Sequence, residues 1–329
     1  MFGRLWQRTK AFFVRLFRLA PPEPGRFEEG SKFSWHGRLA IAPLIWPRRD
    51  YLVYVPRGHG RVPWRRSPLL VLVHGCRQSA EDIAAGSRIT ALADALGCLV
   101  LLPKQNPRAN AWGCWNWFDR RTASGNGETA ILAAQIRAVR RRYRVHRHRV
   151  FAAGLSSGAG LVAALAMSNS RLLAGMFLHS GVAAGAASSP LTALSVLQKG
   201  PDQDVMTIGA HARATAGTGA HTVPALIVQG ERDDFVAPMH ATEIVRQVLA
   251  FARFPAVEAA DRETTSITDD GRHVTVREWH DGPRLIARLV LVNELGHAWS
   301  GGDPAIKYND AQGPAATDML RAFIADVLV

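Results

Sequence analysis

The chain has 329 residues, 47% of them hydrophobic, and a formal net charge of +13, so it can bury one large core. Its basic residues, mostly Arg, are spread along the chain without an RNA- or DNA-binding motif, and we therefore expect no nucleic-acid partner. Three Cys without a Cys-x-x-Cys spacing predict neither a disulfide scaffold nor a metal site, and a transmembrane-length apolar run, a P-loop and a dinucleotide fingerprint are all missing.

The first 20 residues differ in pattern from the rest. On a helical wheel, aromatic and aliphatic side chains share one face, with Arg and Lys on or beside the other. Basic residues interrupt every candidate apolar region, which is not typical of a cleavable signal peptide. The pattern favours an interfacial helix over residues 1–20 that binds an anionic membrane or a polymer granule, but it also fits a helix packed on the protein or a disordered start. The apolar face comprises Phe2, Leu5, Trp6, Phe12, Phe13, Leu16, Phe17 and Leu19.

Three prolines, Pro21, Pro22 and Pro24, mark a linker after this segment. We therefore divide the chain into a basic amphipathic helix with its linker, residues 1–24, and one folded domain, residues 25–329. The pattern leaves a cytoplasmic and a surface-associated location equally open.

Apolar strands alternate with helical segments after the linker. An antiparallel strand pair at a sheet edge is expected at Leu39–Leu44 and Tyr51–Val55, and Ser79 is expected to cap a helix over Ala80–Leu96. The alternation predicts a mostly parallel central sheet with helices on both faces, and the Ala-, Gly- and Ser-rich residues 182–222 are expected to form a cap-like insertion. The other expected strands are Leu69–Val73, Cys98–Leu102, one that begins at Arg149, Ala174–Leu178, Pro224–Gln229, Val274–Trp279 and Leu285–Val292, and the other helices are Glu128–Tyr143, Ala159–Met167 and Ala315–Leu328.

The segment Gly154-Leu155-Ser156-Ser157-Gly158 lies between a buried strand and a helix of small residues. Gly-x-Ser-x-Gly at such a junction is typical of a nucleophile elbow, in which the flanking Gly residues let the backbone pass close to its neighbours. A chain with 29 Gly can contain the motif by chance, but the strand before it and the helix after it favour the functional interpretation. Ser156 is the candidate nucleophile, because the Gly residues lie two positions to either side of it.

A nucleophilic Ser needs a base and a third group that orients the base, and in this type of fold they follow in the order Ser, acid, His. The strand Pro224–Gln229 runs into a turn with Asp233 and Asp234, either of which could be the acid or part of a solvated turn. His297 follows a strongly apolar strand and a Gly, which distinguishes it among the 12 His residues. It is the candidate base.

Negative charge that develops on a carbonyl oxygen needs fixed N–H donors. The loop after Leu69–Val73 begins with His-Gly-Cys, so its backbone could supply one donor at Cys76. Ser157, the residue after the candidate nucleophile, could supply the second. These two residues are the predicted oxyanion hole.

Several short motifs are distributed from Tyr51 to the end of the chain. They are Val73–Ser79, Cys114–Phe118, Gly127–Glu128, Gly154–Gly158, His179–Gly181, Gly230–Pro238 and Gly296–Gly302. In this combination the chain resembles the poly(3-hydroxybutyrate) depolymerase-type esterases of the α/β-hydrolase superfamily. The Cys-Trp-Asn-Trp-Phe and Gly-His-Ala-Trp-Ser-Gly-Gly runs separate this family from other hydrolases, and the resemblance implies the α/β-hydrolase fold.

The resemblance implies Ser156 as nucleophile, Asp233 rather than Asp234 as acid, and His297 as base. It also implies a disulfide between Cys76 and Cys114, which would leave Cys98 as a free thiol. Many family members are secreted, so the resemblance points to the extracellular region. Arg77 departs from the small residue that usually follows His-Gly-Cys in the family, and this position bears on substrate choice.

Four Trp residues are expected to line the substrate pocket, because the ring face and N–H of Trp suit an amphipathic ester chain. Packing in the core is the alternative for all of them. They are Trp112, Trp115, Trp117 and Trp299.

The sequence thus predicts a serine esterase that hydrolyses short hydroxyacyl esters or poly(3-hydroxybutyrate)-type oligomers through an acyl-enzyme, with no metal or organic cofactor. A feruloyl- or acetyl-type carbohydrate esterase on the same core is the alternative among enzymes. An alternative of another class is a membrane- or granule-binding protein with an inert hydrolase core, against which the complete Ser, Asp and His set argues.

Overall fold

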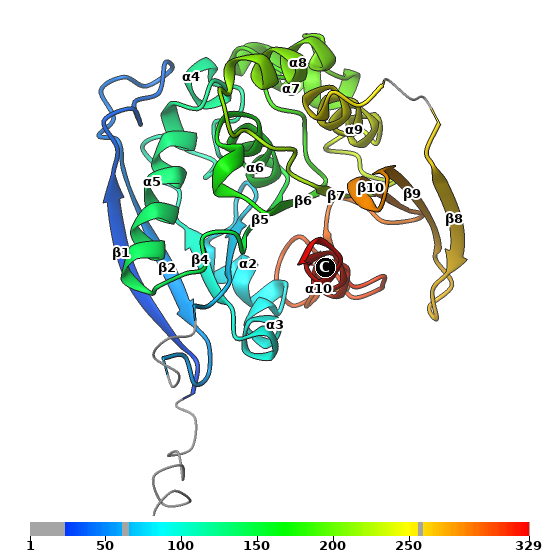
Figure 1. The fold of residues 1–329 in the computed structure, drawn as a ribbon, viewed down its shortest axis with the longest axis horizontal. Coiled ribbons are helices and arrows are strands. Elements are labelled where there is room, and N and C mark those ends of the chain that lie inside the picture. Colours follow the sequence, from blue (N-terminus) through cyan, green and yellow to red (C-terminus); the bar gives the residue numbers. More distant parts are fainter. Residues whose placement is uncertain (1–23, 61–65, 256–258, 329) are drawn as a thin grey trace, which may run out of the picture.

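The computed structural model describes residues 24–60, 66–255 and 259–328, and the predicted N-terminal helix lies outside them. Within these residues, one sheet crosses the molecule in the order β1-β2-β4-β3-β5-β6-β7-β10-β9-β8 (Figure 1). The central strands from β4 to β10 are parallel, whereas β1, β2, β9 and β8 pair antiparallel at the two edges. The strands are β1 Arg26–Phe33, β2 Arg48–Val55, β3 Leu69–Val73, β4 Leu99–Pro103, β5 Val150–Leu155, β6 Gly175–His179, β7 Ala225–Gly230, β8 Arg262–Ile267, β9 His273–Asp281 and β10 Arg284–Val292.

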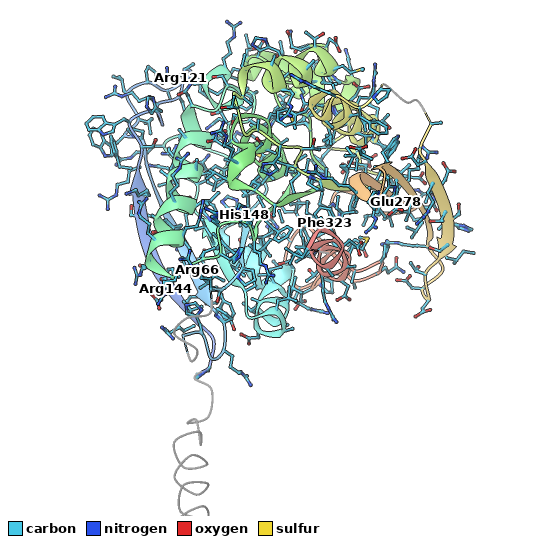
Figure 2. The ribbon with its side chains drawn as sticks, viewed as in Figure 1. Arg66, Arg121, Arg144, His148, Glu278 and Phe323 are labelled. Carbon is cyan, nitrogen blue, oxygen red and sulfur yellow. A yellow bond between two sulfur atoms is a disulfide. The ribbon has the colours of Figure 1, made fainter. Side chains whose placement is uncertain are left out.

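Helices cover both faces of the sheet, as Figure 1 shows. Successive side chains of a strand point to opposite faces of the sheet and so pack into two separate cores. Leu69 and Val71 of β3 pack on one face, and Leu70 and Leu72 pack on the other. The first core is closed by α5 (Gly127–Arg142), α6 (Ser157–Ser168) and α9 (Met239–Ala252). The second is closed by α2 (Ala80–Gly86), α3 (Ile89–Leu96) and α10 (Ala316–Leu328), and Phe323 of α10 is fully buried there (Figure 2). The predicted α/β-hydrolase arrangement is confirmed.

The predicted edge strand at Leu39–Leu44 is wrong. Strand β1 instead pairs with β2, with Arg26 opposite Val55 and Phe33 opposite Arg48. Residues 34–47 form the loop between them, because the backbone N–H groups of Ala40 and Ile41 donate to Oδ2 of Asp119 rather than to a strand. An apolar stretch was thus mistaken for a strand, and a largely polar strand was missed.

The predicted helix over Ala80–Leu96 is two helices. Ser79 does cap α2, with a reciprocal pair of bonds to Asp82. The helix then ends at Gly86, and Arg88 takes a φ of 54°. Distant groups bind the carbonyls that this break leaves open, since the Asp303 N–H donates to Gly86 and the Thr317 hydroxyl to Ser87.

Residues 182–222, the predicted cap-like insertion, contain α7 (Pro190–Lys199) and α8 (Val205–Thr215). Ser189 caps α7 by accepting from the Thr192 N–H, and Pro190 occupies its first turn. In Figure 1 both helices lie outside α6 and α9. The remaining elements are α4 (Arg120–Ala123), the 3-10 helix Ser170–Leu172, β11 (Trp299–Ser300) and β12 (Asn309–Asp310).

Candidate active site

Ser156 joins β5 to α6 in a strained conformation. Its φ is 57° and its ψ is −121°, a region that side chains other than Gly rarely adopt. The Ser156 N–H donates to the His179 carbonyl at 2.9 Å, which ties the turn to the next strand. This is the backbone geometry of a nucleophile elbow, at the carboxyl edge of the parallel strands.

The two Gly residues of the motif are required by close backbone contacts. A Cβ atom at Gly154 would lie 2.5 Å from the carbonyl carbon of Gly158. A Cβ atom at Gly158 would lie 2.3 Å from the carbonyl oxygen of Val73. Any side chain at either position would therefore push β5, α6 and β3 apart and displace Ser156.

The loops after β7 and β10 are joined by their backbones. The N–H groups of Glu231 and Arg232 donate to the carbonyls of Val292 and Leu295, both at 3.0 Å. Gly230 permits this approach, because a Cβ atom there would lie 2.2 Å from the Leu295 carbonyl oxygen. The joined loops bring Asp233 and His297 together, with Nδ1 of His297 2.8 Å from Oδ2 of Asp233.

Asp233 is held as a carboxylate by several donors. Its Oδ1 accepts from the N–H groups of Phe235 and Val236, and its Oδ2 accepts from Gln229 as well as His297. Burial alone would raise the pKa of the carboxyl, but the hydrogen bond and charge of His297 and the backbone donors outweigh it, so the pKa lies below its usual value. Asp234 is exposed and contacts Gln198 through its carbonyl.

Two aromatic rings lie near the partly buried His297. The ring centroids of Phe235 and Tyr308 are 5.3 Å and 6.4 Å from that of His297. No hydrogen bond links Ser156 Oγ to His297 in the described part of the chain. Bonds of this kind commonly close only once substrate is bound.

The predicted oxyanion donors have open N–H groups. Over residues 24–60, 66–255 and 259–328, neither the Cys76 nor the Ser157 N–H has a protein acceptor. Ser157 is the first residue of α6, where N–H groups have no partner within the helix. The Gln78 side chain fixes the preceding turn by accepting from the Gly75 N–H at 2.9 Å.

A disulfide joins Cys76 to Cys114, with the two Cα atoms 4.1 Å apart. Next to it, the Arg77 N–H donates to the Trp112 carbonyl. The disulfide and this hydrogen bond therefore both join the loop after β4 to the loop after β3, which we call the oxyanion loop because it carries Cys76. Cys98 is the free cysteine, and burial raises the pKa of its thiol to about 12.

A buried ion pair supports the loop after β4. Glu128, at the start of α5, contacts Arg49 at 3.1 Å, and both side chains are almost fully buried. Its carboxylate also accepts from the backbone and side-chain N–H groups of Asn116 and from the side chain of Gln105. The sequence singled out Glu128 only within the Gly127–Glu128 motif. In the structure its carboxylate contacts Arg49, Asn116 and Gln105, and so positions the loop after β4.

The four predicted pocket tryptophans occupy different environments. Trp112 is 61% exposed and lies under the Arg77 guanidinium, whose carbon is 4.4 Å from the ring centroid. Trp115 is buried against His74, and its Nε1 has no partner among the described residues. Trp117 packs on Gly160 and Trp299 on Phe177, and both are buried. Trp115, Trp117 and Trp299 all belong to the hydrophobic cores, as the core-packing alternative expects, and their contact with substrate stays a prediction.

His179 was named in the sequence only as part of the His179–Gly181 motif, without a role. It is fully buried, and burial together with the charge of His297 lowers its pKa to about 3. Its ring stacks on Trp299, with the centroids 5.5 Å apart. Nε2 accepts from the Ser300 N–H, so the proton of the neutral ring is on Nδ1, which donates to the Ser180 hydroxyl. His179 thus links the elbow to the loop that follows His297.

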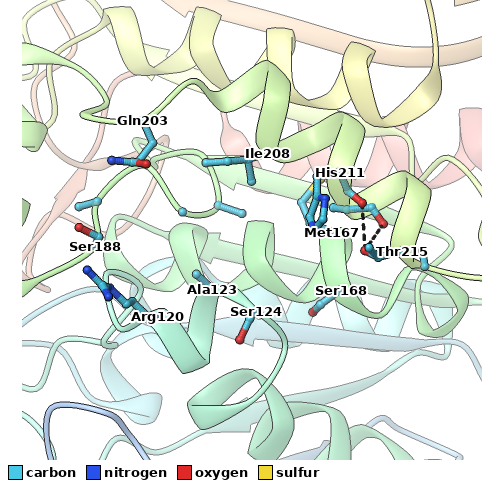
Figure 3. A pocket seen from close by; sticks show the side chains of 15 residues that line it. Arg120, Ala123, Ser124, Met167, Ser168, Ser188, Gln203, Ile208, His211 and Thr215 are labelled. Atoms are coloured by element: carbon cyan, nitrogen blue, oxygen red, sulfur yellow. Dashed lines mark hydrogen bonds between the residues drawn. The ribbon is translucent and has the colours of Figure 1, made fainter.

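A cavity of about 490 Å³ lies between α4, α6 and α8, away from these residues (Figure 3). Arg120, Met167 and His211 line it, whereas Ser156, Asp233 and His297 do not. The described residues contain no cluster of His, Cys, Asp and Glu suited to a metal ion. They also contain no helix that is both long and apolar enough to span a membrane.

Comparison with known proteins finds related esterases by sequence and a shared fold among solved structures. Poly(3-hydroxyalkanoate) depolymerase C from Paucimonas lemoignei is 28% identical over 183 residues, which are 55% of this chain and 44% of that protein. Probable acetylxylan esterase A from Aspergillus clavatus is 29% identical over 135 residues, 40% of this chain and 42% of that protein. The chain thus spans less than half the length of these relatives.

Feruloyl esterase B from Thermothelomyces thermophilus is 26% identical over 201 residues, 59% of this chain and 67% of that protein. Among solved structures, the acetyl xylan esterase from Aspergillus awamori shares the fold, with a TM-score of 0.69 at 18% identity over 92% of this chain and 99% of that one. The family profile described as esterase PHB depolymerase matches residues 49–269. Since that match covers about two thirds of the sequence, the chain belongs to the PHB depolymerase esterase family.

Proposed function

We propose that the chain is a serine esterase that hydrolyses carboxylic esters through an acyl-enzyme. The observation that carries the proposal is the Asp233–His297 hydrogen bond, formed at the same carboxyl edge of the sheet as the strained Ser156. With Nδ1 donating to Asp233, the lone pair of His297 is on Nε2, which can accept the proton of the Ser156 hydroxyl. Family membership supports the same class of reaction.

In the first half of the reaction, Ser156 Oγ attacks the ester carbonyl carbon as its proton moves to His297. The carbonyl oxygen becomes negatively charged and is stabilised by the N–H groups of Cys76 and Ser157. The tetrahedral intermediate then collapses, the ester C–O bond breaks, and His297 donates its proton to the departing alcohol. Asp233 stabilises the imidazolium ion in between.

In the second half, His297 takes a proton from water, whose oxygen attacks the acyl carbon. Collapse of the second intermediate releases the carboxylic acid and returns a proton to Ser156 Oγ. Apart from the ester and water, the groups in this cycle are side chains and backbone N–H groups of the chain.

We infer that the substrates are short hydroxyacyl esters or poly(3-hydroxybutyrate)-type oligomers, on the basis of the depolymerases among the relatives. The exposed ring of Trp112, beside the oxyanion loop, is the candidate contact for the acyl chain. A panel of p-nitrophenyl esters run beside 3-hydroxybutyrate oligomers tests this inference. Turnover of the oligomers at rates similar to the short esters would support it, and turnover of short esters alone would exclude the oligomers.

A feruloyl or acetyl carbohydrate esterase is the second candidate. It is favoured by the acetylxylan and feruloyl esterases among the relatives. Acetylated and feruloylated xylan fragments belong in the same panel, and preference for them over hydroxyacyl esters would select this candidate.

A membrane- or granule-binding protein with an inert core remains the alternative of another class. Residues 1–20 would then carry the function by binding the surface. Their amphipathic pattern supports surface binding whether the core is an active esterase or inert. A serine-directed phosphonate probe separates the two, because an inert core would leave Ser156 unlabelled.

A further inference from the structure

The loop between β1 and β2 exposes large apolar side chains. Leu44 is 95% exposed, Trp35 81% and Trp46 60%. The Phe33 ring contacts both tryptophans, with its centroid 4.8 Å from that of Trp35 and 5.1 Å from that of Trp46. We call residues 33–46 the aromatic loop. Contiguous apolar surface of this kind marks an interaction site in soluble proteins.

The backbone of the aromatic loop is fixed by hydrogen bonds. Besides the two bonds to Asp119 Oδ2, the Ser34 N–H donates to the Pro47 carbonyl and the Gly127 N–H to the His36 carbonyl. Gly37 packs so closely that a Cβ atom there would lie 2.5 Å from the Ile131 side chain. The exposed side chains therefore project from an ordered scaffold anchored on α4 and α5.

Basic residues are interspersed with and flank the apolar residues along this part of the sequence. Between Ser31 and Arg49 the sequence has four Lys or Arg residues and no Asp or Glu. Arg49 is buried in its pair with Glu128, which leaves Lys32, Arg38 and Arg48 on the loop and its flanks. Arg121 of α4 donates to the Arg38 carbonyl at 2.7 Å, and Figure 2 shows it at the same corner of the molecule.

The loop leaves the sheet at the edge that carries the active site. Strand β2 runs antiparallel to β4, with Tyr51 opposite Pro103, so the start of β2 lies beside the carboxyl end of β4. The elbow and the loops with Asp233 and His297 leave the carboxyl ends of β5, β7 and β10. Other exposed apolar residues belong to segments that leave this edge: Trp112, Leu191, Leu194, Phe235 and Met239.

We propose that the aromatic loop docks on the surface of an anionic lipid bilayer. Trp rings favour the interfacial region of a bilayer, and the cations of the loop and its flanks are attracted to acidic headgroups. Burial of Trp35, Leu44 and Trp46 would remove their apolar surface from water while the backbone stays bonded to the protein. The docking would turn the active-site edge of the sheet toward the membrane. This surface is separate from residues 1–20 and does not depend on the esterase assignment.

The test is sedimentation of the full chain with vesicles of phosphatidylcholine, with and without phosphatidylglycerol. The Trp35→Ser/Trp46→Ser variant should lower the partition coefficient on the mixed vesicles by about tenfold or more, equivalent to about 1.4 kcal/mol. The control is Phe27→Ser, which removes an exposed aromatic side chain near the start of β1, at the other end of that strand from the aromatic loop, and should partition as the wild type does. Thermal unfolding midpoints equal to that of the wild type verify that both variants are folded.

Three results would overturn the proposal. One is equal partition of the Trp variant and the wild type, since residues 1–20 are the same in both. Another is equal binding to vesicles with and without the acidic lipid. The third is a Trp variant that loses only self-association, measured by sedimentation equilibrium, or only adsorption to polyester granules, which would assign the loop to a second copy or to the polymer.

Discussion

Nδ1 of His297 lies 2.8 Å from Oδ2 of Asp233, although 64 positions separate the two residues in the chain. The contact depends on the backbone bonds that join the loops after β7 and β10, and on a Gly230 that has no room for a side chain. The same bond would place the proton of the neutral ring on Nδ1 and leave Nε2 unprotonated, as the proposed base requires.

Asp233→Asn should lower kcat by roughly 10³- to 10⁴-fold on soluble esters, because an amide neither selects the His297 tautomer nor stabilises its cation. Asp234→Asn is the matched control and should change kcat little, since Asp234 is exposed and uses only its carbonyl. Steady-state kinetics of both variants decide the assignment. A larger loss at Asp234 would move the acid by one residue.

Ser156→Ala should abolish ester turnover, with a loss on the order of 10⁶ in kcat, while the protein stays folded. Ser157→Ala should be mild, because only the backbone N–H of Ser157 is assigned a role, although its hydroxyl accepts from the backbone N–H of Trp115. Burst kinetics with p-nitrophenyl esters check the pair. Similar losses in both variants would mean that the nucleophile is misplaced.

The central strands could be predicted because they are buried on both faces and are therefore continuous apolar runs. Leu69 to Leu72 of β3, for example, contribute to both cores. Strand β8 could not, since all its residues are exposed and it carries no apolar alternation. Strand β1 was missed for a similar reason, and the apolar stretch 39–44 attracted the prediction instead. The local sequence pattern does not reveal that the Asp119 carboxylate accepts hydrogen bonds from the N–H groups of Ala40 and Ile41.

In the candidate site, motif spacing pointed to residues that follow the carboxyl ends of β5, β7 and β10. It could not choose between Asp233 and Asp234, because both lie in the same turn and only the resemblance separated them. Nor could it distinguish an exposed Trp112 from a buried Trp299, whose burial depends on Phe177 and His179 from a distant strand. Contacts of this type are set by tertiary packing, which sequence periodicity does not encode.

The Cys76–Cys114 disulfide should be detectable by counting the free thiols of the denatured protein before and after reduction. Denatured, unreduced protein should expose one thiol, that of Cys98, and reduced protein three. Because the bridge closes a loop with a sequence separation of 38 residues, the Cys76→Ser/Cys114→Ser variant should lose about 4 kcal/mol of unfolding free energy by the loop-entropy estimate. Three thiols before reduction would show that the bridge is not formed in the protein as prepared.

A chain that begins at Gly25 should keep its activity on soluble esters, because β1 starts at Arg26 and the active-site residues lie far beyond it. It should bind anionic vesicles or polymer granules less than the full chain, since the amphipathic residues 1–20 are removed. Sedimentation and kinetics on the two chains measure both effects. Loss of soluble activity or of folding would instead make the N-terminal segment a structural part of the domain.

Stability should fall in acid through His179. Its pKa is about 3 in the folded protein against an ordinary value of 6.5, so between these values the unfolded state binds more protons than the folded state. Unfolding free energy should therefore drop as pH falls from about 6.5 toward 3, by at most about 1.4 kcal/mol per pH unit. The His179→Gln variant removes this titration, while other buried His residues titrate equally in both proteins. Urea unfolding from pH 7 to pH 4 should show the stability difference between wild type and variant shrinking as pH falls, and a constant difference would mean that His179 is not held neutral by the fold.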